Sequence, residues 1–392
     1  MSMDRRRFLS QSLALGCSAA ASPLLTPVAF ASAPWENRLV VILLRGAMDG
    51  LDAVRPVGDR DFAALRPGLT EGSGHTDLTG FFALHEGFDA LLPLWQAGEL
   101  SFAHAVSTPY RDKRSHFDGQ DMLEAGIAAL DQGVRDGWLN RMLASVPGLE
   151  ADIAYAVGQE SMLILQGPAP VSSWSPEVDL TLSPATEALM EHVFHSDPLF
   201  RDAGSMALRI SDEVAEFDEM GAETVGRGVH VDLAQFAASR LVQETRIAAF
   251  SIGGWDTHRN QSGALRGRLR RLSDAILTLK AGLGPDVWGK TTVLCMTEFG
   301  RTARENGNAG TDHGTGGAMV LAGGAVRGGR VEAEWPGLSE ADLYARRDLT
   351  PTRDVRAHAA WTMRHLFGLP VSTLEQAVFP GLDMGTDPGL ML

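Results

Sequence analysis

The chain has 392 residues, with 49 Asp or Glu against 34 Lys or Arg, which gives a formal net charge of -15. A protein this acidic lacks the basic field that general nucleic-acid binding requires, so we expect no nucleic-acid partner. Its two cysteines exclude a disulfide framework. Beyond residue 31 no apolar run reaches the length of a membrane-spanning helix, so we expect no transmembrane segment in the mature protein.

The first 31 residues are typical of a twin-arginine export signal. Arg5 and Arg6 precede Phe8 and Leu9, a mildly apolar run follows, and Ala29-Phe30-Ala31 fits an A-x-A cleavage site. We therefore predict export to the periplasm or the medium and a mature chain that is more acidic still. After cleavage Cys295 is the only cysteine, and its place in an apolar strand predicts a buried, inert thiol.

Strand and helix patterns alternate along the mature chain. Short apolar, β-branched runs predict strands, and apolar residues at helical spacing predict helices. In chain order we expect strands at Arg38–Leu44, Leu100–Val106, Ile153–Val157, Ser161–Leu165, Ile247–Ile252, Thr291–Met296 and Ala318–Ala322. We expect helices at Glu86–Gly98, Asp118–Ala125, Gly137–Val146, Val231–Glu244, Ala264–Leu283 and Val355–Phe367. This order predicts one α/β domain over residues 32–392, a three-layer sandwich with a mainly parallel sheet and helices on both faces.

Two segments depart from this alternation. Pro56–Gly80 is rich in turn residues and is predicted to be a loop. Residues 172–229 contain two helical stretches, Ala185–His195 and Met206–Phe217, with little strand pattern, so we expect a small helical insertion or cap at the rim of the domain. The histidines in or beside these helices are predicted to be solvated or packed in the core: His192, His195 and His230.

Acidic and imidazole side chains gather in the loops at the predicted strand ends, where open α/β sheets bind ligands. The candidate metal ligands are Asp49, Asp256, His258, Glu298, Asp312 and His313. Asp256 and His258 can face one ion from a tight turn, whereas the adjacent Asp312 and His313 point apart, so one of the two is expected to ligate it. Asp49 has an alternative role as a helix cap. Histidine and carboxylate ligands without thiolate suit Zn²⁺, with Mn²⁺, Mg²⁺ or Ca²⁺ as alternatives.

A basic, hydroxyl-rich loop follows the strand at Leu100–Val106 and opens a predicted helix. A helix N-terminus attracts anions, so Ser115 and His116 are candidates for a nucleophile or an anion contact, and Arg114 for steadying an anion. Ser115 has an alternative role as the helix N-cap. Arg301 is suited to bind an anionic substrate group bidentately, or to pair with Glu298 or Glu305.

The stretches RGAMDGLD, RSHFDGQD, GGWDTH, TEFGRT and GTDHGTGG, together with the twin-arginine start, resemble the exported family DUF1501 over nearly the whole mature chain. That family is grouped with the alkaline phosphatase and sulfatase superfamily, so the resemblance implies an alkaline phosphatase-like fold. By the order of the superfamily's site residues, Asp49 resembles the first Asp and Ser115 stands where the nucleophile would be. Asp256 and His258 resemble the Asp…His pair, Glu298 stands where the Asp of the Asp-His pair would be, and His313 resembles the late His.

Two departures from that pattern bear on activity. Phe299 follows Glu298 where the superfamily has a histidine, so a second ion loses a ligand unless His116 or Asp312 replaces it. The sulfatase-type cysteine motif is also missing. The sequence thus predicts an exported metal-dependent hydrolase of small anionic phosphate or sulfate esters, in which Ser115 or a metal-bound water attacks. The alternatives are a non-catalytic binding or assembly protein on the same fold, and a mononuclear metalloenzyme of another reaction type.

Overall fold

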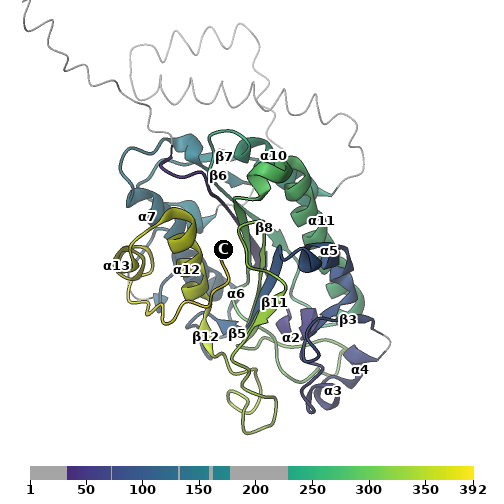
Figure 1. Cartoon of the computed structure of the whole chain (residues 1–392). Coiled ribbons are helices and arrows are strands. Elements are labelled where there is room, and N and C mark those ends of the chain that lie inside the picture. Colours follow the sequence, from purple (N-terminus) through teal and green to yellow (C-terminus); the bar gives the residue numbers. More distant parts are fainter. Residues whose placement is uncertain (1–32, 72, 131–132, 159–161, 177–227) are drawn as a thin grey trace, which may run out of the picture.

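The computed structural model describes residues 33–71, 73–130, 133–158, 162–176 and 228–392. Within these ranges nine strands form one twisted sheet between two helical layers (Figure 1). The strands are β1 (Arg38–Arg45), β5 (Leu100–Ser107), β6 (Ala154–Val157), β7 (Ser172–Trp174), β8 (Ile247–Gly253), β9 (Thr291–Met296), β10 (Gly317–Ala322), β11 (Arg330–Glu332) and β12 (Arg353–Asp354). Their order is β11-β5-β10-β9-β1-β8-β6-β7, with β12 beside β5.

The sheet is mostly parallel, and β10 is its reversed strand. β1 pairs in parallel with both β8 and β9, whereas β10 runs antiparallel to its two neighbours, β5 and β9. The carboxyl ends of β1, β5, β8 and β9 therefore meet the start of β10 at one edge of the sheet. This edge carries the polar loops that the sequence singled out.

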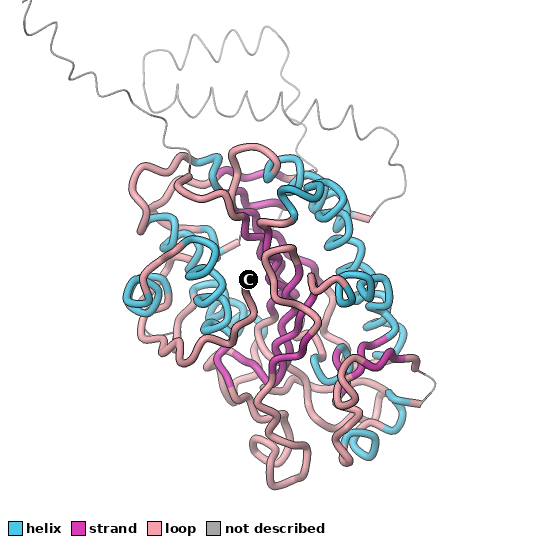
Figure 2. Tube along the Cα trace, viewed as in Figure 1, coloured by secondary structure: helices cyan, strands magenta, loops and turns pink. Residues whose placement is uncertain are grey.

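Helices cover both faces of the sheet (Figures 1 and 2). One face packs on α5 (Leu92–Gln96), α10 (Val229–Leu241) and α11 (Gln261–Trp288), and the other on α6 (His116–Ala125), α7 (Trp138–Ala144), α12 (Val355–Phe367) and α13 (Val371–Thr373). Alternate residues of β1 serve the two cores, since Val40 and Ile42 face one side and Leu39 and Val41 the other. A strand that is buried on both sides needs a nearly continuous apolar run, and this run is why the sequence predicts β1.

Short elements fill the connection from β1 to β5. They comprise α2 (Gly50–Ala53), β2 (Val54–Arg55), α3 (Phe62–Leu65), α4 (Pro67–Thr70), β3 (His75–Asp77) and β4 (Ala83–His85). β2, β4 and β3 form a small antiparallel sheet. The predicted loop Pro56–Gly80 is therefore partly ordered into short elements, which are too brief to show a period in the sequence.

Two predicted elements, the strand Ser161–Leu165 and the helix Glu86–Gly98, differ from the structure. Leu163–Leu165 is a 3-10 helix instead of part of a strand, and the backbone N–H of Ile164 donates to the buried Glu124 carboxylate at 3.1 Å instead of to a neighbouring strand. The predicted helix Glu86–Gly98 splits into a 3-10 helix (Glu86–Leu91) and α5, because Pro93 in the first turn of α5 supplies no N–H to continue the earlier turn.

The ends of the predicted insertion belong to the main domain. Ser172–Trp174 is strand β7, which pairs with β6 in parallel, and Val229 begins α10. The predicted helices Ala185–His195 and Met206–Phe217, with His192 and His195, lie outside the described residues. Over the part of the chain that the structure describes, no helix combines the length and the apolarity that a membrane span requires.

A buried histidine on α12 gives the fold a measurable acid sensitivity. His358 is 1% exposed, neither ring nitrogen has a hydrogen-bond partner among the described residues, and the Glu332 Oε2 atom lies 3.8 Å from Nε2. Burial, helped by the charge of Arg353, lowers the pKa of His358 from 6.5 to about 3. The imidazole is therefore neutral in the folded protein over the whole range in which an unfolded chain would protonate it.

We expect His358→Leu to reduce the loss of stability in acid. The unfolded chain binds more protons between pH 6.5 and about 3, so the stability tied to neutral His358 is complete above pH 6.5 and falls as the pH drops. This one group should contribute ~1.4 kcal/mol per pH unit in that window. Urea unfolding of wild type and variant across the window measures the two slopes. His75→Leu, at an exposed position of β3, should keep the wild-type slope. Equal slopes for His358→Leu and wild type would contradict the prediction.

Candidate metal centre

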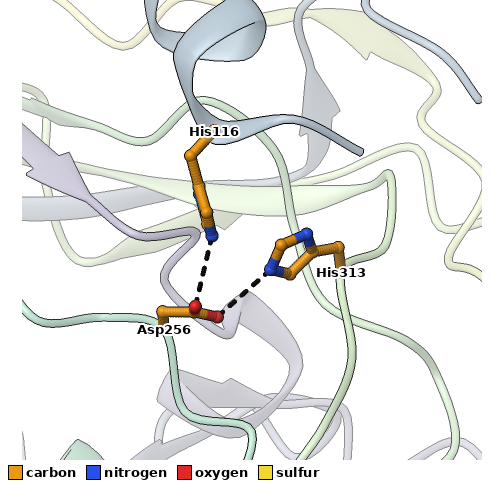
Figure 3. Close-up of side chains that lie close together, drawn as sticks. All are labelled: His116, Asp256 and His313. Carbon is orange, nitrogen blue, oxygen red and sulfur yellow. Dashed lines mark hydrogen bonds and ion pairs between the residues drawn. The ribbon is translucent and has the colours of Figure 1, made fainter. Parts of the chain in front are cut away.

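Three side chains from separate loops converge at the carboxyl-end edge of the sheet (Figure 3). His116 is the first residue of α6 after β5, Asp256 follows β8, and His313 precedes β10. Each offers one ligand atom, and these atoms lie within 4.8 Å of one another. The Nε2 atom of His116 is 3.4 Å from Asp256 Oδ2, and the Nε2 atom of His313 is 3.2 Å from Asp256 Oδ1. Asp256 is 41% exposed, so the group is open to solvent.

Both imidazoles are held by their Nδ1 atoms. His116 Nδ1 lies 2.7 Å from Glu298 Oε1, and His313 Nδ1 lies 2.9 Å from the backbone oxygen of Arg114. Since a carboxylate and a carbonyl only accept, each Nδ1 carries a hydrogen. Each Nε2 atom faces Asp256, that of His313 within hydrogen-bond distance, and it presents a lone pair when the ring is neutral and an N–H donor when the ring is protonated. The buried His116 Nε2 has no hydrogen-bond partner among the described residues. Lone pairs aimed at a carboxylate repel it unless a cation or a proton lies between them.

His258 repeats this arrangement beside the group of three. Its Nδ1 atom lies 3.0 Å from Asp312 Oδ1, and its Nε2 atom lies 3.0 Å from Asp256 Oδ1. The rings of His258 and His313 are neighbours, with centroids 4.7 Å apart. Asp256 therefore stands among three imidazoles, each with a backbone or carboxylate acceptor on its outer nitrogen. Outer-shell acceptors of this kind fix the tautomer and orientation of metal-ligating histidines.

The Asp256 carboxylate is fixed by Arg301. The Arg301 Nη1 atom donates to Asp256 Oδ1 at 2.6 Å, and the rest of the guanidinium binds the backbone oxygen and the hydroxyl of Thr311. Burial alone raises the pKa of the Asp256 carboxyl, but the hydrogen bond and charge of Arg301, with His258 and His313, lower it below its usual value. Asp256 is thus ionised and oriented before any ligand binds.

One glycine lets two of the loops pack directly together. Gly46 has φ +116°, and a Cβ atom placed there would lie 2.7 Å from the backbone nitrogen of Asp256. A larger residue would be strained and would push the Asp256 loop away. The Gly46 N–H also donates to Glu298 Oε1 at 2.9 Å, so the same turn holds the carboxylate behind His116.

Comparison with known proteins assigns the family. Residues 96–369, most of the chain, match the family model described as "Protein of unknown function (DUF1501)". The chain belongs to the DUF1501 family. The matched residues include His116, Asp256 and His313, whereas Asp49 precedes them. A search of curated proteins gave no match. Among solved structures, the crystal structure of the lipoteichoic acid synthase LtaP from Listeria monocytogenes has 10% identity and a TM-score of 0.41, covering 93% of this chain and 78% of that chain.

In this DUF1501 chain Asp49 does not belong to the group of three. It is fully buried, and its Oδ2 atom binds Arg66 Nη1 and Gln261 Nε2, each at 2.7 Å. Its Oδ1 atom accepts from the Asp52 N–H at 3.2 Å as the N-cap of α2, the alternative role considered above. Although burial alone raises the pKa of Asp49, Arg66 lowers it below the usual value. Asp49, a predicted metal ligand, is therefore already engaged in an ion pair with the buried Arg66.

Glu298 and Asp312 support the histidines from behind. Glu298, 1% exposed, accepts from His116, from the Gly46 N–H and, at 3.2 Å, from Gln120 Nε2. Burial alone raises the pKa of the Glu298 carboxyl, but the hydrogen bond from His116 lowers it below its usual value. Asp312 holds His258. Of the adjacent pair, only His313 belongs to the group of three, as the expected divergence of Asp312 and His313 requires.

The basic loop contributes in a way the sequence does not reveal. Ser115 caps α6, with its hydroxyl accepting from the Asp118 N–H at 3.4 Å, and its own N–H donates to the Tyr110 hydroxyl at 2.8 Å. Arg114 has φ 55° and holds His313 through its carbonyl, while its side chain is exposed. A backbone acceptor leaves no trace in the residue type, so only the coordinates could show this role.

Arg301 and Phe299 flank the group formed by His116, Asp256 and His313. Arg301 binds Asp256, whereas the sequence suggested a substrate anion, Glu298 or Glu305 as its partner. Phe299 stacks on His116 with ring centroids 5.1 Å apart, and its ring lies 5.3 Å from that of His313. The hydrogen bond to Glu298 raises the pKa of His116 despite burial, whereas burial lowers the pKa of His313. His116 is accordingly the more basic of the two imidazoles.

Proposed function

We propose that this chain is an exported metal-dependent hydrolase of phosphate or sulfate esters, built on one alkaline phosphatase-like α/β domain over residues 32–392. The observation that carries the proposal is the arrangement around Asp256. Two Nε2 atoms, each on a ring that already donates from Nδ1, face one ionised carboxylate, and the three ligand atoms lie within 4.8 Å of one another. The order of the motifs along the chain, which resembles that superfamily, supports the same reading.

The residues present fit a divalent cation. The orphaned His116 Nε2 atom gains a partner when an ion binds between it and Asp256. Two nitrogens and one carboxylate oxygen suit Zn²⁺ or Mn²⁺ better than Mg²⁺ or Ca²⁺, which prefer oxygen ligands. The Nε2 atom of His258 lies 3.0 Å from Asp256 Oδ1 and would be available as a further nitrogen ligand. We therefore propose Zn²⁺ held by His116, Asp256 and His313.

We propose one ion instead of two. The places that a second ion would need are taken by other interactions: Asp49 pairs with Arg66, Asp312 binds His258, and Phe299 packs its ring on His116. Phenylalanine offers no ligand atom, and a buried carboxylate already paired with arginine gives up that pair only at a large cost in free energy.

When bound, the ion would polarise an ester oxygen and lower the pKa of a water or hydroxyl at the site. The chain's own groups set the geometry. The Ser115 hydroxyl accepts from the Asp118 N–H, so its own hydrogen is free to be donated elsewhere. The exposed side chains of Lys113 and Arg114 and the N-terminus of α6 attract an anionic ester toward the centre. Arg301 keeps Asp256 in place.

Metal analysis and ester hydrolysis test the proposal together. Protein purified from the periplasm should carry about one zinc per chain, should lose it to a chelator, and should regain it with a rise in melting temperature. Hydrolysis of 4-nitrophenyl phosphate or 4-nitrophenyl sulfate should follow metal occupancy, and Ser115→Ala separates a serine nucleophile from an attacking water. A protein that takes up no divalent ion and is fully stable without it would refute the proposal.

A non-catalytic binding or assembly role is the second candidate. Phe299 at a ligand position and the engagement of Arg301 with Asp256 favour it, because both remove groups that would act on a bound ester. This reading expects metal uptake without turnover of either ester, and a Ser115→Ala variant whose ligand binding matches wild type.

A further inference from the structure

A cavity of about 660 Å³ lies beside the metal centre. Its walls come from the end of α3 and the two residues before that helix, from the loop that follows Arg301, and from residues 338–347. None of the three proposed ligands lines it, but Asp312 does, and Asp312 holds His258 against Asp256. The cavity therefore begins one side chain away from the ion site and is distinct from it.

The cavity has an apolar base and a charged rim. Ala64 lies beside Leu65, Leu338 and Leu343, and these three leucines belong to one small buried cluster. The charged residues that line the cavity are four arginines and four acids: Arg60, Arg304, Arg346 and Arg347 with Asp61, Glu305, Asp312 and Glu340. Formal charge is balanced, so the ligand that the rim selects depends on which of these groups are already engaged.

Two of the four acids are committed to the protein. Glu305 accepts from the N–H groups of Gly68 and Leu69 at 3.0 and 2.9 Å. Asp312 binds His258 and Asn306, each at 3.0 Å. These two carboxylates therefore belong to the protein's own hydrogen-bond network, whereas Asp61 and Glu340 face Arg60 and Arg346, each at 3.7 Å.

Three of the four arginines at the rim have weak ion pairs or none. Within the described part of the chain the Arg304 guanidinium has no hydrogen bond or ion pair, and its side chain is exposed at the cavity. Arg60 and Arg346 approach acids only at 3.7 Å and are 89% and 80% exposed, so both pairs are weak. Arg304 therefore gives the rim one unpaired guanidinium beyond the two weak pairs, and a guanidinium can bind phosphate, sulfate or carboxylate through two N–H groups.

Arg347 connects the cavity to the ion site. Its Nη1 atom donates to the backbone oxygen of His313 and to Asp348 Oδ1, both at 2.9 Å. A ligand group in the cavity would thus lie against the same loop that presents His313. A molecule long enough to reach both places would put one anionic group at the metal centre and another among the arginines.

We propose that this cavity binds a second anionic group of the substrate, so that the preferred ester is a polyanion with an apolar or neutral body between its charges. The proposal rests on the proposed function for the group at the metal centre, but the cavity's own preference for anions does not. It narrows the substrate class from any small anionic ester to esters that carry a further phosphate, sulfate or carboxylate.

Binding of inorganic tripolyphosphate and of orthophosphate, measured by calorimetry, tests the cavity without requiring turnover. Arg304→Gln should weaken tripolyphosphate binding by about tenfold or more, the loss expected for a charge-assisted hydrogen bond, and should leave orthophosphate binding within about twofold. Arg270→Gln, an exposed arginine of α11 away from the cavity, is the matched control and should change neither. Equal affinities for tripolyphosphate in the Arg304 and Arg270 variants would overturn the inference.

A second measurement separates this inference from the proposed function. If the protein hydrolyses esters, Arg304→Gln should raise KM for 4-carboxyphenyl phosphate with kcat unchanged, and should leave KM for phenyl phosphate as in wild type. If the protein hydrolyses no ester, the hydrolase proposal fails and tripolyphosphate binding alone tests the cavity. Weaker tripolyphosphate binding in Arg304→Gln, with no change in Arg270→Gln, then supports an anion site in the cavity. A KM effect of equal size on both phenyl esters would refute the inference.

Discussion

Asp256→Asn is expected to weaken Zn²⁺ binding by more than about 100-fold, beyond the range reported for outer-shell partners. The substitution removes the negative charge that both Nε2 atoms face, while the asparagine oxygen can still accept from Arg301. The fold should therefore survive, which circular dichroism and urea unfolding of the metal-free proteins would verify. Competition with a chromophoric chelator gives the dissociation constants.

Glu298→Gln is the matched control for that experiment. Its carboxylate touches His116 on the side away from Asp256, so the variant keeps all three proposed ligands and alters only the support of one. We expect ~10–100-fold weaker binding, the usual effect of an outer-shell change. An Asp256→Asn effect no larger than that of Glu298→Gln would remove Asp256 from the ligand set.

Arg66→Met is expected to lower the free energy of unfolding by ~3–5 kcal/mol, the cost of leaving one partner of a buried ion pair uncompensated. Both side chains of the pair are about 1% exposed. Arg66 also donates to the backbone oxygens of Thr302 and Ala303, at 2.6 and 2.9 Å, so its loss frees carbonyls as well as the Asp49 carboxylate. Urea unfolding with a constant m-value would measure the change.

Two comparisons make this result specific. Arg60→Met removes a nearby arginine that is 89% exposed and should alter stability by no more than about 0.5 kcal/mol. Asp49→Asn combined with Arg66→Met removes the unpaired charge and should recover part of the loss. The double variant should also bind zinc as wild type does, since Asp49 lies outside the group of three. Loss of zinc binding on Asp49→Asn alone would instead make Asp49 a ligand.

The central strands could be predicted from the sequence because they are buried on both faces. β1, β5, β8, β9 and β10 are mostly apolar and mostly buried, and each agrees with its predicted range to within one residue at either end. β7, β11 and β12 were missed, since two or three residues at the margin of a sheet show no period. The reversed direction of β10 is also invisible in its own sequence, because direction is set by which neighbours the strand pairs with.

The sequence predicted the location of the candidate site better than the roles of its residues. Placing polar residues at strand ends led to Asp256 and His313, and the structure brings both to one point with His116. From the sequence, His116 is a catalytic candidate, with replacement of a missing metal ligand as its alternative role, and Glu298 is a ligand, while the coordinates place Glu298 behind His116. Nothing in the residue types near Asp49 reveals that Arg66, carried by a short connection, would neutralise it.

The antiparallel placement of β10 beside β9 has a consequence for how the centre assembles. Glu298 and His313 lie on a single connection between neighbouring strands, and the bridge between Arg301 and His313 closes this connection on itself. Such sequence-local contacts can form early in folding, whereas His116 and Asp256 come from distant segments and arrive only when β5 and β8 dock. The proposed ligand set is therefore complete only in the native state, and under the proposal a higher concentration of free cation would shift the equilibrium toward the folded protein.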